Sequence, residues 1–411
     1  MEKEIFGLIG RKLGHSDSAI IHDTFGLKDY RLFEIEPDEI ESFLNTPGLK
    51  GLNVTIPYKM DVIPFMDELT DEAKAVGSVN TIVFRNGRKI GHNTDVFGLM
   101  YMAKRAGIDF SNKKAVVFGN GGASRAVVYA AKKMGAREIV VISRTGENNY
   151  ENLYLHEDAD ILINATPVGM YPNPEGAIVD PARFQKAVGC MDLVYNPRLT
   201  DFLRLSKQAG KIAVNGLGML VAQAKEAEEW FLDREISDSE IERVLTHVAR
   251  ARTSIALVGM PGAGKSAIGK RLGELSGLPV YDADTEVEKE AGMTIPEIME
   301  KEGVPAFRER EAAVIKSLSL LRGAVIVTGG GAVLREDNRL NLKRNARVYQ
   351  IARDVALLPK EGRPLSVDLA QMEKDRAPYY ALSRDVMIQN NTTIEEAAEK
   401  IWRDFCENTR D

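Results

Sequence analysis

The sequence is poor in cysteine and has no long apolar run. Cys190 and Cys406 are the only cysteines among its 411 residues, and neither belongs to a CxxC or Cys/His spacing. That argues against a disulfide framework or a zinc site, and it indicates a reducing compartment. No apolar stretch approaches membrane-spanning length, and the N-terminal residues MEKEIFGLIG have too short an apolar run for a signal peptide. We therefore expect a cytoplasmic protein.

The chain also lacks a basic tract. Its formal net charge is −6 at pH 7, so it offers no electrostatic surface for nucleic acid or for an anionic membrane. We expect neither as a partner and predict small soluble ligands instead, while the formation of a homo-oligomer stays open.

Length and pattern predict several α/β domains. A chain of 411 residues is long for one domain. Short β-branched runs alternate with helical patterns, which predicts a parallel sheet with crossover helices; the runs are 115–118, 139–142, 161–163 and 191–194. A helical pattern over 237–251 precedes a further strand, and we place a domain junction near 247–253.

A phosphate-binding loop is predicted at 259–266. The residues GMPGAGKS fit the pattern G-x-x-x-x-G-K-[ST], with an apolar run before them and a helical pattern after them. Backbone N–H groups of such a loop point at phosphate oxygens, Lys265 reaches the terminal phosphates, and Ser266 is placed to ligate Mg²⁺. An ordinary glycine turn does not require this Lys–Ser pair. The pattern therefore predicts nucleotide binding by Gly262, Ala263, Gly264, Lys265, Ser266 and Ala267.

A second glycine cluster, GNGGASRA at 119–126, lies far upstream. It follows a strand predicted over 114–118 and opens a helix rich in small residues, as in a dinucleotide-binding turn. Glycines also mark any tight strand-to-helix turn, so the end of the next strand decides more. That strand ends in Ser143, Arg144 and Thr145, and an arginine there suits the 2′-phosphate of NADP(H) where NAD would meet a carboxylate. A solvated arginine is the alternative.

Polar residues crowd the region before this turn. The stretches HSDS, GLNVTIPYK, GSVNT and GHNTD lie at 15–18, 51–59, 77–81 and 91–95. A substrate rich in hydroxyl groups needs such donors and acceptors, and ketone reduction needs a proton source beside the carbonyl, for which Lys59 and Asp95 are candidates. A solvated lysine, a helix N-cap at Asp95 and asparagines in turns are the alternatives.

Together these motifs resemble the shikimate dehydrogenase family over residues 1–245, including NATPVGM, DLVYNP and NGLGMLVAQA at 164–170, 192–197 and 215–224. The resemblance implies NADPH-dependent reduction of 3-dehydroshikimate to shikimate, with Lys59 and Asp95 as the catalytic pair. The substrate-binding residues that it implies are Ser16, Ser18, Thr55, Asn80, Asp95, Tyr195 and Gln223. The cofactor-binding residues that it implies are Gly119, Asn120, Gly121, Gly122, Ala123, Ser143, Arg144, Thr145, Gly216 and Met219.

The first half departs from the usual family pattern at a few points. Ala19 stands where a proline usually follows the serine motif, Asn120 replaces a common alanine, and Ser143 replaces a common asparagine. Only about twenty residues separate Arg144 from Asn164, too few for the usual helix-and-strand unit. We therefore expect a trimmed cofactor lobe.

The second half resembles the shikimate kinase family over residues 253–411. After the phosphate loop come YDAD, FRERE, GGG, GRPL and DRAPYY, at 281–284, 307–311, 329–331, 362–365 and 375–380. The resemblance implies a small P-loop kinase of the nucleoside monophosphate kinase type, which phosphorylates shikimate to shikimate 3-phosphate with ATP and Mg²⁺.

The residue roles in this half follow from the same resemblance. Shikimate would be bound by Asp284, Arg308, Gly330 and Arg376, and Mg²⁺ by Ser266 and Asp282. Catalysis would depend on Lys265, Asp284 and the lid residue Arg363, in a lid at 357–363 that is shorter than usual. Charged helix faces are the alternative interpretation of Arg308 and Arg376.

Both resemblances together imply an α/β protein in which the first enzyme makes the substrate of the second. The expected domains are a substrate lobe (1–98 plus 216–248), a trimmed Rossmann-type NADP lobe (99–215) and a P-loop kinase domain (249–411). One alternative is a quinate or other hydroxy-acid dehydrogenase fused to a related small-molecule kinase. The other is a metabolite sensor without turnover, whose expected mark is loss of a catalytic residue; Lys59, Asp95, Lys265 and Asp284 are all present.

Overall fold

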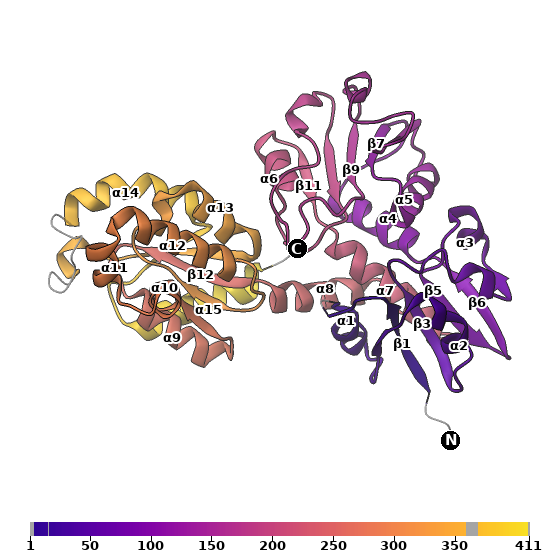
Figure 1. Cartoon of the computed structure of the whole chain (residues 1–411), viewed down its shortest axis with the longest axis horizontal. Coiled ribbons are helices and arrows are strands. Elements are labelled where there is room, and N and C mark those ends of the chain that lie inside the picture. Colours follow the sequence, from indigo (N-terminus) through magenta and orange to yellow (C-terminus); the bar gives the residue numbers. More distant parts are fainter. Residues whose placement is uncertain (1–3, 15, 359–368, 410–411) are drawn as a thin grey trace. The chain divides into compact units, whose positions relative to one another are not determined.

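The computed structural model describes residues 4–14, 16–358 and 369–409. These fall into two compact units that meet in the sequence at Val248 and Ala249 (Figure 1). Among the described residues, no helix is both long and apolar enough to cross a membrane.

The first unit begins with a mixed sheet in the order β2-β1-β3-β5-β6-β4. Its strands are β1 (Ile5–Gly10), β2 (Arg31–Glu34), β3 (Leu49–Val54), β4 (Glu68–Leu69), β5 (Thr81–Arg85) and β6 (Arg88–His92). Its helices are α1 (Ser18–Phe25), α2 (Ile40–Leu44) and α3 (Asp71–Val76), and α7 (Leu217–Leu232) returns to it from later in the chain. Gly51 lets the ring of Phe231 in α7 lie directly on β3, because a Cβ there would overlap that ring.

A second, parallel sheet in the same unit has the order β11-β10-β9-β7-β8. Its strands are β7 (Lys114–Phe118), β8 (Glu138–Ile142), β9 (Ile161–Asn164), β10 (Gly189–Asp192) and β11 (Ile212–Val214). Alternate residues of β7 face opposite layers. Val117 packs with α4 (Asp95–Ala106) and α5 (Gly122–Lys133), whereas Val116 packs with α6 (Asp201–Gln208), and Figure 1 shows α5 and α6 on opposite sides of the sheet.

Two details of this sheet bear on the sequence predictions. Between β8 and β9 the chain forms only a short 3₁₀ helix, Leu153–His156, in place of a helix and a strand. The strand predicted over 191–194 is displaced, since β10 ends at Asp192. The buried Asp192 carboxylate accepts hydrogen bonds from the Val194 backbone N–H at 3.0 Å and from Thr200 Oγ1 at 2.6 Å, so the chain turns there and leaves the sheet.

The second unit is a five-stranded parallel sheet in the order β13-β14-β12-β15-β16. Its strands are β12 (Ser254–Gly259), β13 (Val280–Asp282), β14 (Val325–Val327), β15 (Ala346–Ala352) and β16 (Val386–Gln389). It follows α8 (Ser239–Arg252), in which the division between the units falls.

Helices cover both faces of this sheet. Ile255 and Leu257 of β12 pack with α9 (Lys265–Ser276) and α15 (Ile394–Asn408). Ala256 and Val258 face the opposite layer, whose helices are α10 (Ala283–Ala291), α11 (Ile295–Lys301), α12 (Gly303–Leu318), α13 (Glu336–Asn345) and α14 (Leu369–Ser383). The alternating pattern of the sequence therefore predicted the α/β class correctly.

Two candidate active sites

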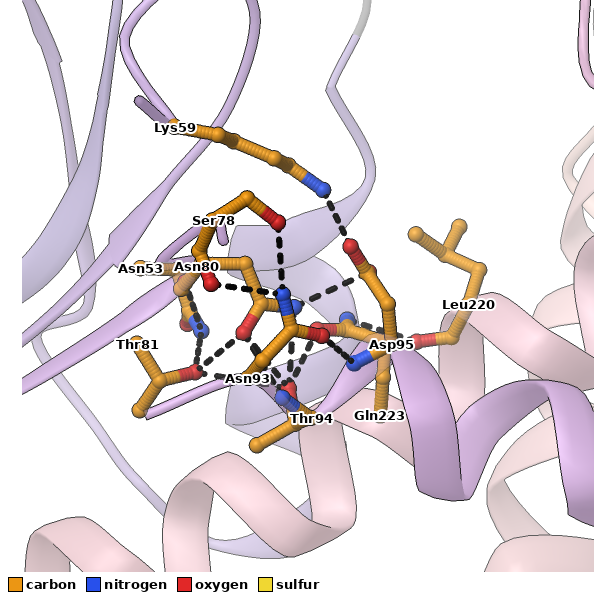
Figure 2. Close-up of polar contacts among 10 residues, drawn as sticks. All are labelled: Asn53, Lys59, Ser78, Asn80, Thr81, Asn93, Thr94, Asp95, Leu220 and Gln223. Carbon is orange, nitrogen blue, oxygen red and sulfur yellow. Dashed lines mark hydrogen bonds and ion pairs between the residues drawn. The ribbon is translucent and has the colours of Figure 1, made fainter. Parts of the chain in front are cut away.

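The candidate site of the first unit is built on the contact between Lys59 and Asp95. Lys59 lies in the turn after β3, and Asp95 is the first residue of α4. Lys59 Nζ donates to Asp95 Oδ2 at 2.6 Å, and the two side chains are only 16% and 8% exposed (Figure 2). The fold thus brings together a proton donor and a carboxylate that the sequence separates by 36 positions.

Asn80 holds the other oxygen of the carboxylate. Its Nδ2 donates to Asp95 Oδ1 at 2.9 Å and to Thr94 Oγ1 at 3.1 Å, and its Oδ1 accepts from the Thr94 backbone N–H at 2.8 Å. Gln223 of α7 joins this network by accepting from Thr94 Oγ1 at 3.3 Å (Figure 2). Both carboxylate oxygens are therefore engaged, and the lysine ammonium is held in one place.

A buried network behind the pair was not recognised in the sequence. Asn53 Nδ2 donates to Thr81 Oγ1 at 3.2 Å, and Asn53 Oδ1 accepts from Tyr30 Oη at 2.6 Å and from His22 Nε2 at 3.1 Å. Thr81 Oγ1 in turn donates to Asn80 Oδ1 at 3.1 Å (Figure 2). Asn53 stands within the quoted stretch GLNVTIPYK, but its partners come from α1, from the residue before β2 and from the start of β5, which no local pattern brings together.

This network predicts a large stability effect at Asn53. Replacing Asn53 by alanine leaves the buried groups of His22 and Tyr30 without a partner, so we expect the free energy of unfolding of the first unit to fall by about 2 kcal/mol. Urea unfolding followed by tryptophan fluorescence in a Trp402→Phe background measures this change. Trp230, in the first unit, is then the one remaining tryptophan of the sequence. The exposed Asn45→Ala serves as the control; equal stability of both variants would contradict the prediction.

Ser16 and Thr55, two of the other predicted substrate residues, lie beside the first sheet, and Tyr195 lies beside the second. Ser16 Oγ donates to Ser18 Oγ at 3.1 Å at the start of α1, and Thr55 follows β3, where its backbone N–H donates to Ile9 O at 3.0 Å. Tyr195 follows β10. Their convergence on a substrate stays a prediction.

The upstream glycine cluster forms the turn between β7 and α5. Gly119 has a φ of +107°, and a Cβ there would lie 2.9 Å from Thr166 Cγ2. A Cβ at Gly122 would lie 4.0 Å from Lys59 Cβ, so the turn stands directly beside the candidate catalytic lysine. A helix N-terminus that opens on Gly121 and Gly122 fits a dinucleotide pyrophosphate. Arg144 is exposed after β8, where it is available to a 2′-phosphate.

The remaining predicted cofactor residues border this turn and the start of α7. Ser143 is buried, Asn120 and Thr145 are not, and Ala123 belongs to the first turn of α5. Gly216 is the N-cap of α7, and a Cβ there would overlap the backbone of Leu193. Met219 is 8% exposed and packs in the core that α4 and α5 share.

In the second unit the P-loop joins β12 to α9. Gly262 and Gly264 have φ values of +83° and +96°, which glycine adopts without strain. Lys265 is buried, and its Nζ donates to the carbonyl oxygens of Gly259 at 2.9 Å and Met260 at 3.0 Å. Ser266 Oγ donates to Asp282 Oδ2 at 2.8 Å. A hydroxyl and a carboxylate in contact fit the oxygen ligands of Mg²⁺. Ala263 lies within the loop, and Ala267 follows it in α9.

Asp284, Arg308 and the glycines 329–331 converge beside this loop. A Cβ at Gly329 would lie 2.7 Å from Asp284 Oδ1, one at Gly330 would lie 2.6 Å from the Pro261 ring, and one at Gly331 would overlap the Arg308 guanidinium. The glycines therefore leave room that any other residue would fill. Burial, with the nearby Asp282 and Glu311 carboxylates, raises the pKa of Asp284 to about 6.

Glu311 is a site residue whose role the sequence analysis missed. It stands in the quoted FRERE stretch, its side chain is 1% exposed, and its Oε2 accepts from Arg308 Nη1 at 2.6 Å. Burial raises the pKa of Glu311. The positive charges of Arg308 and Arg376 act in the opposite direction but do not cancel this rise. The i,i+3 spacing of Arg308 and Glu311 on α12 was the available signal.

Arg376 lies on α14 near Tyr380, whose Oη donates to Gly330 O at 2.7 Å. The glycine run, α12 and α14 thus meet at the predicted shikimate site. Arg363 and most of the predicted lid, 357–363, lie outside the described residues.

These two units define an α/β dehydrogenase joined to a P-loop kinase. The family model for the shikimate dehydrogenase substrate binding domain matches residues 8–82, and the shikimate kinase model matches residues 261–406. The shikimate dehydrogenase (NADP(+)) of Clostridium perfringens strain SM101 is 38% identical over 264 residues, which cover 59% of this chain and 97% of that protein.

Solved structures agree with these matches. A chorismate mutase/shikimate 5-dehydrogenase fusion protein from Clostridium acetobutylicum is similar with a TM-score of 0.57 and 36% identity, over 59% of this chain and 96% of that one. A shikimate dehydrogenase in complex with NADP⁺ is similar with a TM-score of 0.53 and 31% identity, over 59% of this chain and 94% of that one.

The chain belongs to the shikimate dehydrogenase family. Its second unit is a shikimate kinase domain, so the chain is a bifunctional enzyme of the shikimate pathway that uses NADP and ATP. The predicted families, fold class and pair of enzymes are thereby confirmed.

Proposed function

We propose that the first unit reduces 3-dehydroshikimate to shikimate and that the second unit phosphorylates the 3-hydroxyl of that product. The observation that carries the first assignment is the 2.6 Å contact of Lys59 with Asp95 beside the glycine turn. The second rests on the partly buried Asp284 carboxylate, on which the positive charges of Arg308 and of the P-loop Lys265 act.

In the dehydrogenase, NADPH supplies the hydride for the substrate ketone. Lys59 donates the proton to the alkoxide oxygen that develops there, and Asp95 orients the lysine through their 2.6 Å contact. Asn80 positions Asp95. The substrate carboxylate and hydroxyls bind to Ser16, Ser18, Thr55, Tyr195 and Gln223. The cofactor is held by the turn Gly119–Ala123, by Ser143, Arg144 and Thr145, and by Gly216 and Met219.

In the kinase, ATP supplies the phosphoryl group and Mg²⁺ offsets its charge. Lys265 leaves the two loop carbonyls and contacts the phosphates, and Ser266 with Asp282 holds the ion. Asp284 accepts the hydrogen bond of the attacking 3-hydroxyl, while Arg308 and Arg376 bind the substrate carboxylate. Gly330 makes room for the ring, and Arg363 neutralises charge on the transferring group.

The boundary between the two units, at Val248 and Ala249, supports the start of the proposed kinase domain. We assign 1–98 plus 216–248 to the substrate lobe, 99–215 to the NADP lobe and 249–411 to the kinase. The proposed reactions need NADPH, ATP and small-molecule substrates, and the two cysteines of the chain are free. Both observations support a cytoplasmic location for the protein.

A coupled assay tests both assignments. The purified chain receives 3-dehydroshikimate, NADPH, ATP and Mg²⁺, and both the absorbance of NADPH and the release of ADP are followed. We expect ADP only when the ketone and the reduced cofactor are both present, and slower oxidation when NADH replaces NADPH. A parallel reaction with shikimate and ATP isolates the kinase. If NADPH is oxidised but neither reaction releases ADP, the kinase assignment is refuted. If shikimate and ATP yield ADP but the coupled reaction oxidises no NADPH, the dehydrogenase assignment is refuted.

A further inference from the structure

Three side chains of metal-ligand type meet in the first unit, outside the catalytic pair. Glu72 belongs to the first turn of α3, His92 ends β6, and Glu226 lies on α7, one turn after Gln223. One donor atom from each of the three lies within 4.8 Å of the other two. The fold alone assembles this set, because its members are far apart in the chain.

The imidazole of His92 is fixed and aimed into the cluster. His92 is 4% exposed, and its Nδ1 lies 2.9 Å from Thr70 Oγ1. Its Nε2 lies 3.8 Å from Glu226 Oε1 and has no hydrogen-bond partner among the described residues. A metal-bound histidine is typically held in this way, with one ring nitrogen on a neighbouring polar group and the other on the ion.

One of the two carboxylates is also incompletely satisfied, and the other accepts a hydrogen bond from a lysine. Glu226 is 19% exposed, and its buried Oε2 has no hydrogen-bond partner within the described structure. Glu72 Oε1 accepts from Lys133 Nζ at 2.6 Å. The ammonium of Lys133 balances one of the two negative charges and leaves the other for a cation.

We propose that Glu72, His92 and Glu226 bind a divalent transition-metal ion of the Zn²⁺ type, with water completing the coordination. Three atoms no more than 4.8 Å apart surround a point about 2.8 Å from each, and Zn–N and Zn–O bonds measure about 2.0–2.2 Å. Side-chain movements of under about 1 Å therefore close the site. The imidazole nitrogen favours Zn²⁺ over Mg²⁺ and Ca²⁺, which prefer oxygen ligands.

The ion would fasten α3 and α7 to the strand that leads into the catalytic segment. His92 O accepts from the Asn80 backbone N–H at 3.1 Å, and Asp95 follows three residues later. The proposed site uses no cysteine. The absence of a CxxC or Cys/His spacing, which argued against a zinc site, therefore does not bear on it. Occupancy therefore stabilises the substrate lobe without taking part in the reaction.

Trp230 offers a direct readout of binding. Its ring packs against His92 with centroids 4.5 Å apart, so Co²⁺ bound at His92 quenches its fluorescence. The experiment uses the full chain with Trp402→Phe, stripped of metal by a chelator and titrated with Co²⁺ and then Zn²⁺. Excess Mg²⁺ is present throughout to occupy the oxygen site of the kinase. Elemental analysis after dialysis counts the bound Zn²⁺.

We expect one Zn²⁺ per chain, quenching by Co²⁺ that Zn²⁺ reverses, and a melting temperature of the first unit that rises by several degrees. His92→Gln and Glu226→Gln should each weaken binding at least tenfold, whereas the exposed His247→Gln should not change it. Circular dichroism confirms that the variants are folded. The absence of Zn²⁺ from the parent chain, or equal binding by all variants, would overturn the proposal; the parent measurement does so even where a variant fails to fold.

Discussion

Replacing Lys59 by methionine should lower kcat for the reduction of 3-dehydroshikimate by about three orders of magnitude and leave phosphorylation of shikimate unchanged. The size follows from the loss of a positioned proton-transfer group, for which factors of about 10² to 10⁴ are usual. KM for 3-dehydroshikimate should change little, because the ammonium acts on charge that develops only in the transition state. Steady-state assays of both reactions on the same preparation measure the effect.

The contact with Asp95 makes a second variant informative. Because Lys59 and Asp95 form one unit, the double variant Lys59→Met, Asp95→Asn should lose no more activity than Lys59→Met alone. Lys50→Met, at an exposed position of β3, controls for the loss of a lysine from this sheet. Equal losses in Lys50→Met and Lys59→Met would show that the charge acts at long range and would remove Lys59 from the catalytic role.

Sequence reasoning was most successful where a short segment determines its own geometry. A P-loop or a dinucleotide turn depends on glycines with positive φ close before a helix. Gly264 directly precedes α9, and Gly119 stands three residues before the start of α5. The α/β class likewise follows from the alternation of buried strands with amphipathic helices. In both cases the deciding residues are neighbours in the chain.

The partners of the catalytic groups were much harder to predict. Asn53 depends on His22 and Tyr30, and Glu72 meets His92 and Glu226, only after a mixed sheet and a returning helix have formed. A histidine in a polar motif looks the same in the sequence whether it packs in a core or faces a cluster of carboxylates. Asp192 shows a smaller version of this limit. Its buried hydrogen bonds end β10 two residues before the apolar run ends.

The kinase offers the matching experiment on the other unit. Replacing Lys265 by methionine should lower kcat of phosphorylation by about three orders of magnitude, since a charge that offsets the developing negative charge on the phosphates is lost. The dehydrogenase reaction should keep its full rate. The position of Lys265 supports this expectation, because its ammonium is held inside the phosphate loop, at the carbonyls of Gly259 and Met260.

Lys270→Met is the matched control, because Lys270 lies on the same helix at an exposed position and should leave both activities unchanged. Lys265 also contacts its own loop, so its loss could act by deforming the loop. Measuring the binding of ADP separates the two effects. A catalytic role predicts a large fall in kcat with ADP affinity lowered much less, since the lysine contacts the terminal phosphates. If ADP affinity falls as far as kcat, Lys265 acts by shaping the loop, and if oxidation of shikimate falls as well, the two units do not work independently.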